Sequence, residues 1–122
     1  MKTSEKNGIL KIYVGEGDKI NGRLLFEEIV FEARNQGLAG ATVYKGLMSF
    51  GASHSIHTMK IFALSSDLPV IIEIVDNVER LDEFVPAVNK LLDKSKKGGL
   101  ITFQELSVVR YKKGDKYQET YT

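Results

Sequence analysis

Two histidines, His54 and His57, stand three residues apart and are the only histidines in the chain. Neutral imidazole is a good zinc ligand, but a stable zinc site normally has three or four protein ligands. The nearest downstream carboxylate is Asp67, and side chains three residues apart on an extended segment point to opposite faces. We therefore expect these histidines to lie in a loop and to contact a partner or a phosphate. A metal-binding or metal-tolerance protein that uses them is the alternative.

The run Lys-Lys-Gly-Gly at residues 96–99 is a second candidate. Adjacent glycines let backbone N–H groups approach an anion closely, and lysines supply positive charge. Arg110 and the lysines at 112–113 add basic groups further along the chain. Taken alone, the run is equally consistent with a solubilising basic turn. It is not a Walker loop, because no Gly-Lys-Ser/Thr follows it.

The sequence offers no candidate for nucleophilic catalysis. It contains 0 Cys and no G-x-S-x-G, and no carboxylate is evidently paired with either histidine. Gly15 and Gly17 suggest a dinucleotide loop, but the next glycine is Gly22, which is too late for G-x-G-x-x-G. We expect a binding protein rather than an enzyme.

Length and composition bound the class of protein. The chain has 122 residues, 43% of them hydrophobic, and we expect a single domain over 1–122, with a core at about 9–111 and a polar tail at 112–122. Seventeen Lys+Arg against 16 Asp+Glu give a net charge of +1, which argues against nucleic acid as a partner. The start of the chain is polar and no apolar run approaches about 20 residues, so we expect a cytoplasmic protein.

Hydrophobic periodicity predicts six elements that must position these residues. They are a strand over 9–14, a helix from Asn21 that is ended by Gly37, strands over 41–50 and 69–75, a helix capped by residues 76–77, and a strand over 100–111. This order predicts an α+β, ferredoxin-like βαββαβ sandwich. Right-handed connections place both helices on one face of a four-stranded antiparallel sheet.

The third predicted strand is apolar on both faces. Ile72 and Ile74 point one way, whereas Ile71 and Val75 point the other. Each large aliphatic side chain gains about 1.5–3 kcal/mol from burial, so a second apolar face left in water favours association. We predict a homo-oligomer that packs its open sheet faces together in a closed, cyclic assembly.

Residues 51–68 connect two strands that should be neighbours in the sheet. Hairpin loops usually have 2–5 residues, and longer connections are uncommon unless they are functional or disordered. This loop is therefore the best functional candidate in the chain. A longer β-ribbon that uses residues 59–64 as an extra strand is the alternative.

Residues 41–51, ATVYKGLMSFG, followed by the loop and by LPVIIEIVD at 68–76, resemble the PII signalling superfamily. The similarity is to its PII-like branch of short archaeal and bacterial proteins of unknown function, and it covers about 9–111. It implies a homotrimer whose open sheet faces line the centre, with an adenine nucleotide in each cleft between subunits. The residues that it implies for the nucleotide are Ser49, Phe50 and Gly51 beside adenine, and Lys97, Gly98, Gly99 and Arg110 at the phosphates.

Two departures from the PII pattern bear on the ligand. The PII phosphate loop has an acidic residue between its glycines and a lysine after them, which residues 97–100 lack, and the loop at 51–68 contains no tyrosine for modification. A monophosphate needs fewer anionic contacts, so the resemblance favours AMP, with ADP and ATP as alternatives. We expect a regulatory protein whose 51–68 loop engages a partner such as a membrane transporter.

Overall fold

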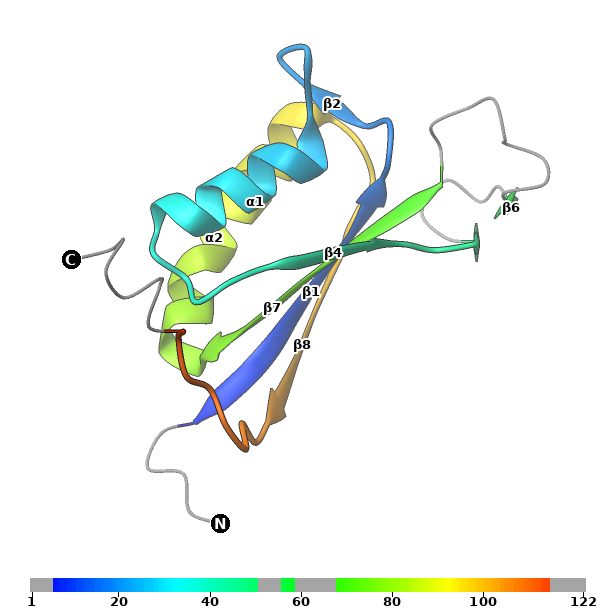
Figure 1. Ribbon diagram of the computed structural model, residues 1–122. Helices are drawn as coiled ribbons and strands as arrows, with labels where there is room; N and C mark the ends of the chain where they lie inside the picture. The colour runs from blue at the N-terminus through cyan, green and yellow to red at the C-terminus, as the bar shows by residue number, and fades with distance from the viewer. Residues whose placement is uncertain (1–5, 51–55, 59–67, 115–122) are drawn as a thin grey trace.

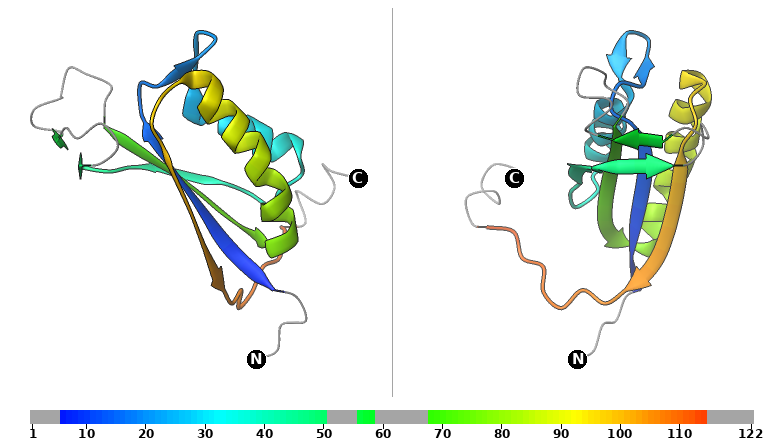
Figure 2. Two further views of the ribbon diagram at one scale, coloured as in Figure 1. Left: turned by 180° about the vertical axis from the view of Figure 1, so that it is seen from behind. Right: turned by 90° about the vertical axis from the view of Figure 1, so that its right-hand side faces the viewer.

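The computed structural model describes residues 6–50, 56–58 and 68–114. In chain order, the elements are β1 (Asn7–Gly15), β2 (Lys19–Ile20), β3 (Arg23–Leu24), α1 (Leu25–Asn35), β4 (Thr42–Lys45), β5 (Met48–Phe50), β6 (Ile56–Thr58), β7 (Pro69–Asn77), α2 (Val78–Ser95) and β8 (Leu100–Leu106). Four of them form an antiparallel sheet in the order β4-β7-β1-β8. Both helices lie on the same side of this sheet (Figures 1 and 2). The predicted ferredoxin-like α+β fold is confirmed.

The hydrophobic core lies between the sheet and the two helices. Every second residue of β1 is buried, which is the period expected of a strand with one covered face. The two helices bury residues spaced three or four apart, which draws one apolar stripe along each. The fully or almost fully buried side chains of this core are Leu10, Ile12, Leu25, Ile29, Val70, Ile72, Ile74, Leu81, Phe84 and Val88.

The first helix begins later than predicted. Asn21 and Gly22 both have positive φ, 51° and 77°, and form the two-residue turn between β2 and β3. Asn-Gly is the preferred sequence for such hairpin turns, because both residues tolerate the left-handed conformation. The prediction that the helix begins at Asn21 is therefore wrong, and α1 begins at Leu25. Gly37, with φ 76°, follows the end of α1 as predicted.

The last strand is shorter than predicted. β8 ends at Leu106, opposite Asn7, the first residue of β1, so no further residue of β1 remains to pair with it. Residues 107–114 leave the sheet, and within them the Tyr111 hydroxyl donates to the Ala39 carbonyl at 3.4 Å. Arg110 consequently lies in this tail segment and not on a strand as predicted.

The second predicted strand is divided at Gly46. Its N–H donates to the Pro69 carbonyl at 2.8 Å, and a Cβ atom at Gly46 would lie 2.7 Å from Cγ of Pro69. Pro69 is the first residue of β7, where its missing N–H is tolerated. Past this point β5 pairs with β6. The strand considered over 59–64 lies outside the described residues.

Candidate functional site

The two ends of the sheet carry different candidate residues. We call the end at which β1 finishes and β8 starts the loop end; there Gly15 pairs with Pro69, and Tyr13 pairs with Leu100. We call the opposite end, where β1 starts and β8 finishes, the tail end. The strand register places the connection between α2 and β8 at the loop end and residues 107–114 beyond the tail end, as Figure 1 shows.

The predicted nucleotide residues lie on three different segments of one subunit. Ser49 and Phe50 lie in β5, which continues from β4 at the loop end, whereas Gly51 lies outside the described residues. Residues 97–99 also lie at the loop end, but beside β8, at the other edge of the sheet. β5 belongs to a separate two-stranded sheet with β6, so the strand order does not fix its distance from residues 97–99. The length of β8, about 20 Å, does separate Arg110 from residues 97–99. One subunit therefore does not bring the three groups together.

The connection between α2 and β8 is already closely packed. Lys96 adopts a left-handed conformation, with φ 59°, and ends α2. The Lys97 N–H donates to Oγ of Ser95 at 3.2 Å, so an anion would have to compete for this N–H. A Cβ atom at Gly99 would lie 3.1 Å from Cδ2 of Leu92 and 3.3 Å from the Tyr13 carbonyl oxygen. Packing alone thus explains why residue 99 is glycine.

The structure places the backbone of only one of the two histidines. His57 lies in β6 and pairs with Ser49 of β5, so it neighbours a predicted nucleotide residue. His54 lies outside the described residues. In the part of the chain that the structure describes, no three His, Asp or Glu side chains are grouped as metal ligands.

A polar cluster that sequence reasoning missed lies on the uncovered face of the sheet, which we call the open face. The Tyr44 hydroxyl donates to Oε2 of Glu73 at 2.7 Å, and Nζ of Lys11 lies 3.9 Å from the same oxygen. The hydrogen bond to Glu73 raises the pKa of Tyr44 above its usual 10.0. Alternate residues of a strand share one face, so Lys11 lies on the same face of β1 as Ile9 and Tyr13. This alternation in the sequence could have shown that Lys11 points to the open face.

Apolar side chains surround this polar cluster. The register places Ile71 opposite Tyr13 and Tyr44, on the open face as predicted. Its neighbours cover Ile71 within the subunit, to 7% exposure, whereas Val75 and Leu100 remain 37% and 55% exposed. The open face therefore combines an apolar surface with one central group of hydrogen-bonded and charged side chains.

The DUF190 family model, described as "Uncharacterized ACR, COG1993", matches residues 8–108. The chain belongs to this family. The UPF0166 protein MJ1524 of Methanocaldococcus jannaschii is 41% identical over 113 residues, which cover 93% of this chain and 98% of that protein. A UPF0166 protein of Aquifex aeolicus is 32% identical over 104 residues, which cover 85% of this chain and 94% of that protein.

Solved structures with the same fold include PII-like proteins. CPII, a nitrogen regulatory PII-like protein from Thiomonas intermedia K12 bound to ADP, AMP and bicarbonate, aligns with a TM-score of 0.67 at 16% identity, over 86% of the DUF190 chain and 90% of its own. The divalent ion tolerance protein CutA1 from Ehrlichia chaffeensis aligns with a TM-score of 0.55 at 12% identity, over 96% and 92%. Similarity at these identities concerns the fold, and it confirms the predicted PII-like fold. No helix among the described residues is long and apolar enough to cross a bilayer.

Proposed function

We propose that this DUF190 protein is a regulatory protein that binds an adenine nucleotide in clefts between the subunits of a homotrimer. The observation that carries the proposal is the separation of the candidate residues, because residues 97–99 lie at the loop end of the sheet and Arg110 lies beyond its tail end. Neighbouring copies can bring these two ends together in one cleft. The PII-like fold that the chain shares with CPII, solved with ADP and AMP, supports a nucleotide as the ligand.

The open face supplies a reason for the copies to associate. Tyr44, Val75 and Leu100 are 41%, 37% and 55% exposed on it. Covering such side chains gains free energy roughly in proportion to the apolar area removed from water. A cyclic trimer uses a heterologous contact, in which one edge of each subunit meets the other edge of the next, and the ring closes without open-ended growth.

In each cleft, one copy would supply residues 49–51 and its neighbour residues 97–99. Arg110, beyond the tail end, would come from whichever copy brings its tail segment to the cleft and would pair with a phosphate. AMP is favoured over ADP and ATP, because the Lys97 N–H is engaged by Ser95 and few other anion contacts are offered. His54 and His57, in the loop at 51–68, would contact a protein partner such as a membrane transporter, or the phosphate. The cytoplasm, where adenine nucleotides are abundant, suits this role.

Isothermal titration calorimetry with AMP, ADP, ATP and cyclic AMP tests the proposal. AMP should bind most tightly, and Lys97→Ala and Arg110→Ala should each weaken it about tenfold, the loss expected for one charge-assisted contact. Lys90→Ala, which removes an exposed charge in α2, is the matched control and should leave affinity unchanged. The absence of both heat and a thermal shift with all four nucleotides would contradict the proposal.

A zinc titration tests the alternative of a metal-binding protein. Three results together would replace the proposed function with a metal-binding one. Zinc binds, His54→Ala abolishes that binding, and none of the four nucleotides binds. If a nucleotide binds and zinc does not, the alternative is excluded.

A further inference from the structure

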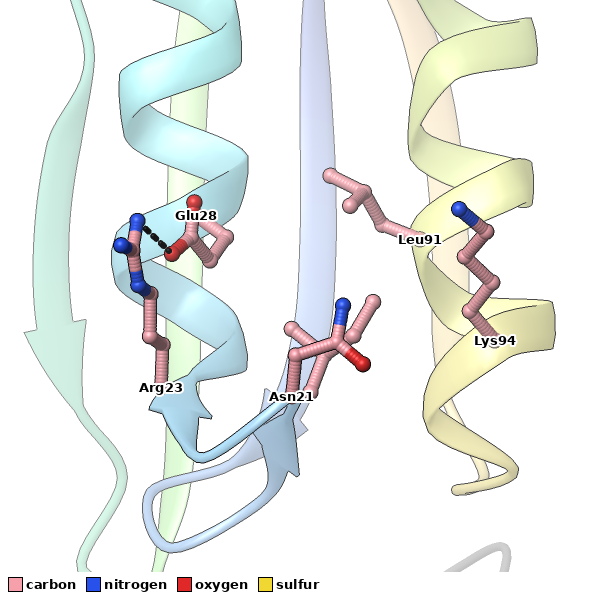
Figure 3. A pocket seen from close by; sticks show the side chains of 6 residues that line it. Asn21, Arg23, Glu28, Leu91 and Lys94 are labelled. Carbon is pink, nitrogen blue, oxygen red and sulfur yellow. Dashed lines mark hydrogen bonds and ion pairs between the residues drawn. The ribbon is translucent and has the colours of Figure 1, made fainter.

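A pocket of about 360 Å³ lies between the β2–β3 hairpin, the start of α1 and the end of α2. Figure 3 shows two walls of the pocket, one with Arg23 and Glu28 and the other with Leu91 and Lys94. Its volume falls within the range of small-molecule sites, roughly 300–1,000 Å³. None of the residues proposed for the nucleotide lines it, so this pocket is a separate feature of the molecule.

Two aliphatic side chains give the pocket an apolar part. Ile20 is only 6% exposed, and Leu91 is partly buried against the core. Both positions are held firmly, Ile20 by its pairing with Arg23 across the Asn21-Gly22 turn and Leu91 by the helix that carries it. A ligand would therefore find preformed hydrocarbon surface mainly at Leu91, because little of Ile20 is accessible.

The polar groups at the pocket are mainly hydrogen-bond donors with positive charge. Arg23 Nη1 lies 3.4 Å from Oε1 of Glu28, in an ion pair that leaves the arginine side chain 77% exposed. Lys94, on the other side, forms no ion pair with another residue of the described ranges. Asn21 adds a side-chain amide. Two cations against one carboxylate leave a net positive charge beside an apolar surface.

We propose that this pocket binds a small amphipathic anion, namely an organic carboxylate with a short hydrocarbon body. The carboxylate lies between Lys94 and Arg23 and accepts from Asn21, while the hydrocarbon contacts Ile20 and Leu91. Buried apolar area supplies part of the affinity and charge-assisted hydrogen bonds fix the orientation. This site does not depend on the proposed nucleotide function.

Three probes separate the two contributions to binding. Hexanoate carries both a hydrocarbon and a negative charge, hexanol carries the hydrocarbon alone, and inorganic phosphate carries the charge alone. In amide NMR spectra of the nitrogen-labelled protein, hexanoate should cause saturable shifts confined to residues around 20–24 and 91–94. Hexanol and phosphate should bind at least about tenfold more weakly, since each lacks one of the two contributions.

Substitutions test which charged side chains contribute to hexanoate binding. Lys94→Gln and Arg23→Gln should each weaken hexanoate binding about three- to tenfold, whereas Glu28→Gln should strengthen it by removing the one carboxylate among the six residues that line the pocket. Lys90→Gln, one turn earlier on α2 and outside the pocket, should change nothing. The proposal is overturned if hexanoate causes no saturable shift at these residues, if hexanol or phosphate binds as tightly, or if Lys90→Gln weakens binding as much as Lys94→Gln. Arg23, Lys90 and Lys94 are exposed and Glu28 is half-buried, and the amide spectra of the variants report directly whether the fold is kept.

Discussion

The hydrogen bond from Tyr44 to Glu73 makes the free energy of unfolding depend on the ionisation of the Tyr44 phenol. Because this bond raises the pKa of Tyr44 above 10.0, the unfolded chain loses the phenolic proton first as the pH rises. The stabilisation is therefore fully present below pH 10.0 and is lost as the pH rises through the folded-state pKa. We expect Tyr44→Phe to remove this part of the alkaline loss of stability, measured by urea unfolding at pH values on both sides of 10.0.

Tyr111→Phe is the matched control for this measurement, because it removes a phenol in the tail segment that donates only to the Ala39 carbonyl. It should leave the alkaline loss of stability in place. An identical pH dependence in wild type and Tyr44→Phe would show that the Tyr44–Glu73 bond does not form in solution.

Asp76 connects three segments at the tail end of the sheet. Its side chain is 8% exposed and accepts from the Ala39 N–H at 2.8 Å and from the Asn77 N–H at 2.7 Å. Nε of Arg80 lies 3.8 Å from the same carboxylate. Hydrogen bonds to charged groups contribute about 1.5–3 kcal/mol each. We expect Asp76→Ala to lower the free energy of unfolding by about 2–4 kcal/mol in denaturant titrations.

Asp82→Ala removes an exposed carboxylate from α2 and serves as the control, with an expected change of less than about 0.5 kcal/mol. Equal effects of the two substitutions would mean that only the loss of negative charge matters. The Asp76 contacts would then contribute nothing specific to stability.

Among the elements, α2 contains a proline that costs it one backbone hydrogen bond. Pro86 lies inside the helix, on an exposed position, where it lacks the N–H that would donate to the carbonyl four residues earlier. Proline in a helix interior lowers stability by about 3 kcal/mol relative to alanine. Part of this loss is offset because proline also lowers the conformational entropy of the unfolded chain. We expect Pro86→Ala to raise the free energy of unfolding by about 1–3 kcal/mol, measured by thermal and urea unfolding. Lys90→Ala should have almost no effect, and a Pro86→Ala protein no more stable than wild type would contradict the argument.

Helices and strands were predictable where their pattern is local. Asn77 was predicted to cap α2, and its Oδ1 accepts from the Glu79 N–H at 2.9 Å. Asn21 has the same side chain but is followed by Gly22, and this dipeptide favours a hairpin turn over a helix cap. The end of β8 was not predictable from its own residues, because Leu106 is last only through its pairing with Asn7. Pairing between distant residues, and not local preference, sets such boundaries.

At the scale of the whole molecule, the proposed trimer predicts a defined mass in solution. We expect wild type to be a trimer by light scattering and Val75→Lys to dissociate it, because a lysine opposite Ile9 would place a charge in the apolar part of the contact between copies. Nucleotide binding should be lost with the trimer. Val109→Lys, at a 78% exposed tail position, is the control and should remain trimeric. A stable wild-type monomer would contradict both the assembly and the shared site.

The candidate site could be predicted from the sequence only in part, because its geometry depends on how distant elements pack together. The sequence places Ser49, Lys97 and Arg110 on separate elements, but which edge or end each element occupies follows from the strand order. The pocket between Arg23 and Lys94 was missed because nothing in the chain between these residues indicates that they meet. Contacts across helices and between copies arise from packing, which a single pattern of residues does not display.

The strand order has a further consequence for how the chain acquires its structure. In β4-β7-β1-β8, strands from the first half of the chain alternate with strands from the second half, so every ladder joins one half to the other. A nascent N-terminal half leaving the ribosome holds β1 and β4 but cannot pair them with each other. The four-stranded sheet therefore cannot begin to form until β7 has been synthesised, when β7 can join β4 to β1, and β8 is added to β1 last. Separately made halves should combine as complementing fragments.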